Sequence, residues 1–336
     1  MKLSHEQIRA ICQGAVRTKE TEKGVRLYRF TESQEELYRQ VKADFHRKSF
    51  ASAGMKLCFK TDSTSLFLKV NVTPASTRQY FSIDVWVNGT LAGYLDNYSH
   101  MELPHNYATV QCSLGEFSKK FDLGEGNKQV KIYLPWSVAA EIIDLSLDDH
   151  AWLTPVRPEK KLLAFGDSIT QGYDALRPSS RYIARLAEAL GAEEVNKAIG
   201  GEWFRPELVR EREAFEPDYI TVAYGTCDWS RLGEDEFKDN CSGFYEALSR
   251  DYPNAEIIAI TPIWRKDYKE DTKFGSFFKV AEDIEAIAKE HGNITCCHGF
   301  DFVPPEEMYF GDLWLHPNDR GFDHYFRKLL GQLKER

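Results

Sequence analysis

The apolar residues of this 336-residue chain follow two different periods, and the change between them constrains the fold more than any other feature. Before residue 150, apolar and polar side chains alternate, as at Leu66, Leu68, Val70 and Val72, which is the period of a half-buried β-strand. After residue 160, short apolar runs alternate with segments of helical spacing. The sequence therefore predicts an all-β part followed by an α/β part.

The all-β part is expected over residues 1–153. Segments 81–87 and 130–134 repeat the same alternation, and Asn88-Gly89 between strands is a strong hairpin signal, because both residues accept the positive φ angles of a type I′ turn. Several strands with short turns predict a β-sandwich, jelly-roll-like domain, preceded by a short helical or irregular segment at 4–13.

A connection rich in proline and charge follows at residues 154–161, and the second domain is expected over 160–336. Alternating strands and helices predict a parallel sheet covered by helices on both faces, a three-layer α/β/α domain. The expected strands are 161–166, 193–197, 218–224, 255–261 and 294–298, and the expected helices are 178–190, 234–250 and 274–291. In such sheets, ligands bind at the carboxyl ends of the strands.

Composition argues against several classes of partner. There are 43 basic and 52 acidic residues, a net charge of −9, and no basic run, which argues against nucleic acid or an anionic membrane surface. No apolar leader or membrane-spanning stretch is visible, and seven cysteines with no paired framework indicate a cytoplasmic protein. Histidine and cysteine spacings predict no metal site, no cofactor motif is visible, and the oligomeric state is left open.

The apolar run from Leu162 to Phe165 ends abruptly at Gly166, Asp167 and Ser168, and a helix is expected to follow. This layout places the Ser168 hydroxyl at the carboxyl end of a buried strand, beside free backbone N–H groups. A serine there either acts as a nucleophile or caps the helix, and both roles are compatible.

Two later segments repeat the pattern of a strand end followed by polar or glycine residues, and a third lies just before the expected C-terminal helix. Segment 195–201 runs into Gly200-Gly201, segment 217–228 ends in Cys227-Asp228, and segment 315–321 begins Leu315-His316-Pro317. Together with the first segment, their order resembles the four blocks of the SGNH, or GDSL-type, ester hydrolases. The resemblance covers residues 162–325 and implies an enzyme in which Ser168 is the nucleophile and His316 the general base.

The resemblance is looser at the third catalytic residue. Asp312 would orient His316, but the family usually spaces the pair as Asp-x-x-His, and this chain has one residue more. A bulged loop could absorb the extra residue. Alternatively, a backbone carbonyl could hold the imidazole and leave a Ser–His dyad, with Asp312 a solvated loop carboxylate.

By the same resemblance, the oxyanion hole comprises the backbone N–H groups of Ser168 and Gly201 and the third-block side chain, normally asparagine, here Cys227. A thiol is a weaker donor than an amide, and losing one oxyanion donor typically costs about 10²–10³ in turnover. Cys227 therefore implies a slower enzyme, a compensating donor or a site that no longer hydrolyses. It could also be a reactive thiol or a small buried residue.

Aromatic and acidic residues beside the blocks are the expected substrate-binding residues, because aromatic rings pack against sugar rings or acyl chains. They are Asp167, Asp228, Trp203, Trp229 and Trp314.

Two-domain proteins of this type are often carbohydrate acetylesterases. The resemblance thus implies removal of short acyl groups, acetyl above all, from a sugar or oligosaccharide. Two alternatives remain: a lysophospholipase, thioesterase or arylesterase of the same fold, or a carbohydrate-binding protein on a degraded hydrolase scaffold.

Overall fold

The computed structural model describes residues 1–335, which form two compact units. The first unit comprises Met1–Glu159 together with two short segments, Leu176–Ser179 and Glu193–Val195. The second comprises Lys160–Ala175, Ser180–Ala192 and the chain from Asn196 onward. The main division falls inside the predicted connection. The two short segments that join the first unit have no counterpart in the sequence prediction.

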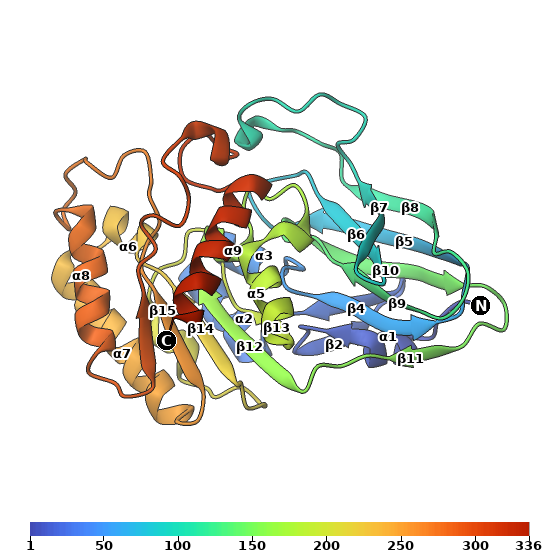
Figure 1. Cartoon of the computed structure of the whole chain (residues 1–336), viewed down its shortest axis with the longest axis horizontal. Helices are drawn as coiled ribbons and strands as arrows, with labels where there is room; N and C mark the ends of the chain where they lie inside the picture. Colours follow the sequence, from blue (N-terminus) through green and yellow to red (C-terminus); the bar gives the residue numbers. More distant parts are fainter. Residues whose placement is uncertain (336) are drawn as a thin grey trace. The chain divides into compact units, whose positions relative to one another are not determined.

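Two antiparallel sheets form the first unit (Figure 1). One has the order β1 (Cys12–Gln13), β4 (Lys56–Thr61), β9 (Lys128–Tyr133), β6 (Ser82–Val87) and β7 (Thr90–Asp96), with β11 (Leu153–Pro155) also paired to β4. The other has the order β2 (Arg17–Glu20), β3 (Val25–Tyr28), β10 (Val138–Leu147), β5 (Ser65–Pro74) and β8 (Gly115–Asp122).

The alternating residues of both sheets meet in one hydrophobic core, as a β-sandwich requires. Leu68 and Val70 of β5 lie in the same buried cluster as Ile83 and Val85 of β6. The predicted hairpin joins β6 to β7, and Asn88 has a φ of 49° there. The alternation therefore identified the buried face of these strands correctly.

Helices of the first unit were predicted only in part. α1 (His5–Ile11) occupies the expected lead-in and begins at a capping box formed by Ser4 and Gln7. Two further helices, α2 (Glu32–Val41) and α3 (Ala43–Ser49), and the short 3₁₀ turn η1 (Tyr107–Thr109) were not predicted. α2 has few apolar residues, and its buried side chains are Gln34 and Tyr38.

A parallel sheet has the order β13 (Ala192–Asn196), β12 (Lys160–Gly166), β14 (Tyr219–Ala223), β15 (Glu256–Ile260) and β16 (Ile294–Cys297). All of it except Glu193–Val195 of β13 belongs to the second unit. β12 lies between β13 and β14, with Gly166 opposite Ala223 at their carboxyl ends. The carboxyl ends of β12 and β14 are thus adjacent, and the residues that follow them are brought to one edge of the sheet.

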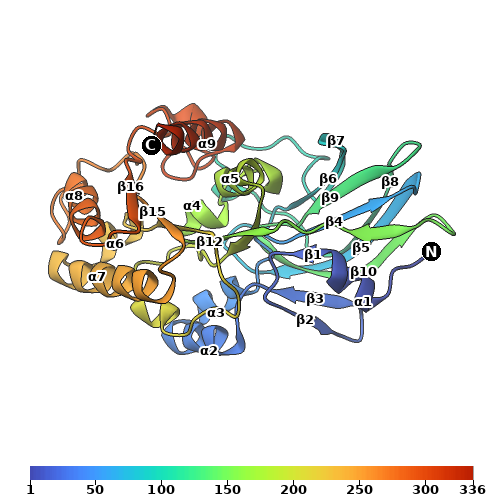
Figure 2. The same ribbon diagram turned by 60° about the horizontal axis from the view of Figure 1, so that its bottom comes forward.

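Helices cover both faces of this sheet (Figure 2). α5 (Tyr182–Leu190) packs with α9 (Asp319–Lys334), and α7 (Glu234–Asp251) packs with α8 (Phe277–Ala288) on the opposite face. The three layers and the preceding β-sandwich confirm the predicted fold class. Short elements complete the unit: α4 (Ser168–Gln171), α6 (Thr226–Arg231), η2 (Pro178–Ser180), η3 (Pro206–Val209) and η4 (Glu307–Tyr309).

Among the residues that the structure describes, no helix has both the length and the apolar character needed to cross a membrane.

Candidate active site

Ser168 is the first residue of α4, directly after β12. Asp167 occupies the N-cap position, and its Oδ1 accepts a hydrogen bond from the Ile169 N–H at 2.9 Å. Asp167 rather than Ser168 therefore caps the helix, and the Ser168 hydroxyl is available for another partner. Ser168 is 5% exposed, so its hydroxyl is largely shielded from solvent.

That partner is His316, whose Nε2 lies 2.8 Å from Ser168 Oγ. His316 comes from the loop between η4 and α9, 148 positions away in the chain. The loop is held because Asn318 caps α9 with its side-chain oxygen and the Gly311 N–H donates to the His316 carbonyl at 2.8 Å. The imidazole is therefore presented to Ser168 from a well-anchored segment.

Asp312 accepts a hydrogen bond from the other ring nitrogen of His316, with 2.6 Å between Nδ1 and Oδ2. Its second oxygen, Oδ1, accepts the backbone N–H groups of Trp314, Leu315 and His316. Burial opposes ionisation of Asp312, but the hydrogen bonds and the charge of His316 outweigh it and hold the Asp312 pKa well below its ordinary value.

The extra residue between Asp312 and His316 is accommodated by a bulge. Leu313 has a φ of 62°, in the left-handed region that non-glycine residues seldom adopt. This conformation lets Asp312 fold back onto the three N–H groups and still reach the imidazole. A carboxylate, rather than a backbone carbonyl, thus faces His316 Nδ1.

Two of the predicted oxyanion-hole groups are backbone N–H groups, those of Ser168 and Gly201. Neither the Ser168 nor the Gly201 N–H donates a hydrogen bond to any other residue that the structure describes. Gly201 has a φ of 87°, a conformation that is inexpensive only for glycine. Cys227 lies in the first turn of α6 and is 8% exposed. Burial raises the pKa of its thiol, so Cys227 offers a neutral S–H rather than a reactive thiolate.

Asp167 and Asp228, which were predicted as substrate-binding residues, are buried. Asp228 accepts the Phe204 N–H at 3.0 Å through Oδ1 and the Gly225 N–H at 2.8 Å through Oδ2, so it ties together the loops that carry Gly201 and Cys227. Burial raises the pKa of Asp228 to about 7 and that of Asp167 to about 6. Both carboxyl groups therefore hold the backbone of the segments that follow the strands, Asp167 at the start of α4 and Asp228 at Phe204 and Gly225.

The predicted tryptophans separate into two groups. Trp229 is 1% exposed, donates its Nε1–H to the Gly275 carbonyl and packs edge-on against Phe277, so its predicted substrate contact is replaced by a packing role. Trp314 is 39% exposed, and the Arg265 guanidinium lies 5.2 Å from its ring centre. Trp203 is partly exposed, with the Arg205 guanidinium 4.8 Å from its ring centre. Trp314 and Trp203 can therefore still contact a substrate.

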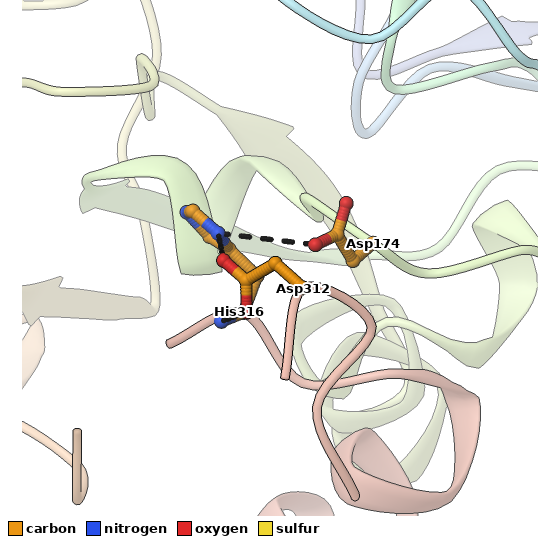
Figure 3. Close-up of side chains that lie close together, drawn as sticks. All are labelled: Asp174, Asp312 and His316. Carbon is orange, nitrogen blue, oxygen red and sulfur yellow. Dashed lines mark hydrogen bonds and ion pairs between the residues drawn. The ribbon is translucent and has the colours of Figure 1, made fainter. Parts of the chain in front are cut away.

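The sequence analysis did not predict Asp174, which the fold places beside His316 (Figure 3). Asp174 Oδ2 lies 3.9 Å from His316 Nδ1, and Asp174 has no exposed surface. The ligating atoms of Asp174, Asp312 and His316 lie within 4.8 Å of one another. A metal ion there would have to displace a hydrogen bond, because both ring nitrogens of His316 already have partners, Ser168 and Asp312. No local signal marked Asp174, because its spacing from Ser168 belongs to no motif.

A serine, a histidine and an aspartate joined by hydrogen bonds at the carboxyl edge of a parallel α/β sheet form an arrangement that serine hydrolases use. Residues 164–324 match the GDSL-like Lipase/Acylhydrolase family, so the second unit is a domain of this family. The protein is accordingly a carboxylic ester hydrolase. A search of curated proteins found no match to this sequence.

Solved structures share the fold over both units. The salicylyl-acyltransferase SsfX3 from a tetracycline biosynthetic pathway is 18% identical, with a TM-score of 0.78 over 96% of this chain and 94% of that chain. A family two carbohydrate esterase from Cellvibrio japonicus is 15% identical, with a TM-score of 0.66 over 100% and 97%. A family two carbohydrate esterase from Clostridium thermocellum, in complex with cellohexaose, is 14% identical, with a TM-score of 0.64 over 85% and 93%.

Proposed function

We propose that this protein removes short acyl groups, above all acetyl, from a carbohydrate through an acyl-enzyme formed on Ser168. The observation that carries the proposal is the unbroken hydrogen-bond chain from Ser168 Oγ through the His316 ring to Asp312. Each group in it has the chemistry that its position requires: a hydroxyl nucleophile, an imidazole base and an ionised carboxylate.

In the first half-reaction, Ser168 Oγ attacks the ester carbonyl carbon while His316 Nε2 takes the hydroxyl proton. The negative charge on the carbonyl oxygen is stabilised by the N–H groups of Ser168 and Gly201. Asp312 stabilises the imidazolium through Nδ1–H. His316 then gives its proton to the sugar oxygen as the carbon–oxygen bond breaks, which leaves the acyl group on Ser168.

In the second half-reaction, water takes the place of the sugar. His316 removes a proton from the water as its oxygen attacks the acyl carbon, and the same N–H groups stabilise the second oxyanion. The proton returns to Ser168 Oγ as the acyl bond breaks and the carboxylic acid leaves. No cofactor is needed for this balance.

The surface beside His316 supports a sugar as part of the substrate. The partly exposed Trp314 ring, two positions before His316, offers a flat apolar face of the kind that packs against sugar rings. An oligosaccharide partner agrees with the carbohydrate esterases among the structural neighbours.

The proposal includes action in the cytoplasm on small oligosaccharides, for which the odd number of cysteines is the support. The binding-protein alternative is disfavoured because a protein without turnover has no need to keep Ser168 Oγ within 2.8 Å of an oriented imidazole.

The test compares the wild type with Ser168→Ala and, as a matched control, with Ser118→Ala, an exposed serine of β8. Para-nitrophenyl acetate, butyrate and octanoate measure the acyl preference, and release of acetate from acetylated oligosaccharides measures the natural reaction. We expect turnover that favours acetate, is lost in Ser168→Ala and is kept in Ser118→Ala. Activity retained in Ser168→Ala would overturn the mechanism. A preference for octanoate would replace the acetyl-carbohydrate proposal with the lipase alternative.

A further inference from the structure

His316 faces two carboxylates rather than one. Asp312 Oδ2 lies 2.6 Å from Nδ1, and Asp174 Oδ2 lies 3.9 Å from the same nitrogen (Figure 3). Asp312 is therefore within hydrogen-bond distance of Nδ1. Asp174 is too far away for a hydrogen bond, but it is close enough for a strong Coulomb interaction with a charged imidazole. Asp174 is fully buried and the side chain of His316 is 13% exposed, so solvent screens this interaction weakly.

The backbone after α4 is shaped so that two consecutive side chains contact the imidazole. Gly172 has a φ of 117°, and Asp174 has a φ of 66°, in the left-handed region. Between them, the Tyr173 ring lies 5.2 Å from the imidazole, centre to centre, at an interplanar angle of 32°. Tyr173 also fills the space beside Gly200, where an added Cβ would lie 2.5 Å from its hydroxyl oxygen. This turn therefore supports His316 from the side away from its own loop.

We propose that Asp174 is a second positioning carboxylate for His316. It stabilises the imidazolium that forms when Ser168 gives up its proton, and it accepts the Nδ1–H when Asp312 cannot. This inference rests on the proposed function, because it concerns the same proton transfer. Asp174 faces His316 Nδ1, whereas Ser168 contacts Nε2, so Asp174 acts on the proton transfer through the imidazole, as a positioning residue.

The geometry predicts that Asp312 and Asp174 share the role of stabilising the His316 imidazolium. When both are present, Asp312 makes the hydrogen bond, and Asp174 adds a charge that favours the cationic ring. When the Asp312 charge is removed, Asp174 is the remaining one of the two carboxylates beside Nδ1. Loss of Asp174 should therefore matter more in the absence of the Asp312 charge than in its presence, a non-additive pattern.

The test uses Asp174→Asn, Asp312→Asn and the double variant, with Asp283→Asn as a control for a carboxylate of α8 in the same unit. Asparagine tolerates the left-handed backbone at position 174. The readouts are kcat and KM for para-nitrophenyl acetate, the rate at which a fluorophosphonate labels Ser168, and the thermal midpoint.

We expect Asp174→Asn to lower kcat by about threefold to tenfold, with KM and the thermal midpoint nearly unchanged. In the Asp312→Asn background, the same substitution should lower kcat and the labelling rate by about 100-fold. Asp283→Asn should behave as the wild type. If Asp174→Asn unfolds the chain, Asp174→Gly removes the carboxylate and suits the backbone at this φ.

The inference would be overturned if Asp174→Asn lowered kcat by the same factor, or by a smaller one, in the Asp312→Asn background than in the wild type. So would an unchanged kcat in every variant at position 174. Fluorophosphonate labelling needs no knowledge of the natural substrate, so it separates two failures. Labelling that is absent in the wild type refutes the proposed function and this inference together. Labelling that occurs normally but ignores position 174 in both backgrounds refutes this inference alone.

Discussion

His316 Nδ1 lies 2.6 Å from Asp312 Oδ2, although four positions separate the two residues in the chain. The loop reaches this distance because Leu313 adopts a φ of 62° and because Asp312 Oδ1 accepts three backbone N–H groups of the same loop. The hydrogen bonds stabilise the loop. The left-handed conformation of Leu313 destabilises it by about 1–2 kcal/mol, which offsets part of that stabilisation.

Replacing Leu313 with glycine should relieve this strain. We expect Leu313→Gly to raise the free energy of unfolding by about 1 kcal/mol relative to Leu313→Ala, which loses the same side chain but keeps the strained φ. Denaturant unfolding measures the difference. The kcat should stay within about twofold of wild type, because the Asp312 hydrogen bonds remain. A glycine variant less stable than the alanine variant would show that the left-handed conformation is not strained.

Cys227 is the third group of the proposed oxyanion hole. Its buried thiol stays protonated because burial raises its pKa, and a thiol is a poor hydrogen-bond donor. Cys227→Asn should raise kcat for an acetyl ester by about tenfold or more, since a side-chain oxyanion donor is typically worth 10²–10³ in turnover, as an order of magnitude. Cys227→Ala is the control and should leave kcat within about twofold of wild type. An unchanged kcat in Cys227→Asn would mean that another donor already serves the oxyanion.

Asp228 should make stability depend on pH. Its pKa is raised by burial from 3.8 to about 7 in the folded protein, so the unfolded chain releases this proton at lower pH than the folded one. The protonated carboxyl therefore contributes stability that is complete below about pH 4 and is lost as pH rises toward 7, up to about 4 kcal/mol in total.

The measurement is the free energy of unfolding of the wild type and Asp228→Asn between about pH 4.5 and 7.5. The asparagine cannot ionise, but it loses one acceptor for the Phe204 and Gly225 N–H groups, so it should be less stable at low pH. The gap between the two proteins should narrow as pH rises. A constant gap would show that Asp228 ionises in the folded protein at the same pH as in the unfolded chain.

Trp314 should contribute to sugar binding without affecting the chemical step. Trp314→Ala is expected to raise KM for an acetylated oligosaccharide by about tenfold, equivalent to about 1.4 kcal/mol of lost stacking. The kcat for para-nitrophenyl acetate should change by less than about threefold. Trp152→Ala, which removes an equally exposed indole of the first unit, is the control. Equal changes in KM for both variants would refute a specific role for Trp314.

Comparison of sequence and structure shows which features local patterns could predict. The strand β12 and the helix start at Ser168 follow from an apolar run that ends at a capping residue, and β6 and β7 follow from an alternation broken by Asn88-Gly89. α2 and α3 were not predicted. Tyr38 of α2 packs edge-on against Phe30 and against Phe45 of α3, and a pattern within one element does not record such contacts between elements.

The sequence by itself determined the two-part architecture, the succession of strands along the chain and the candidates Ser168 and His316, because each depends on residues that are neighbours in the chain. The tertiary structure decided which carboxylates face His316, that Asp228 and Trp229 are buried, and that Leu313 absorbs the extra residue of the loop. These outcomes depend on contacts such as the one between Ser168 and His316, 148 positions apart. Many contacts of this kind compete during folding. A contact that leaves a buried polar group without a hydrogen-bond partner costs free energy and is disfavoured, and no local sequence pattern records that cost.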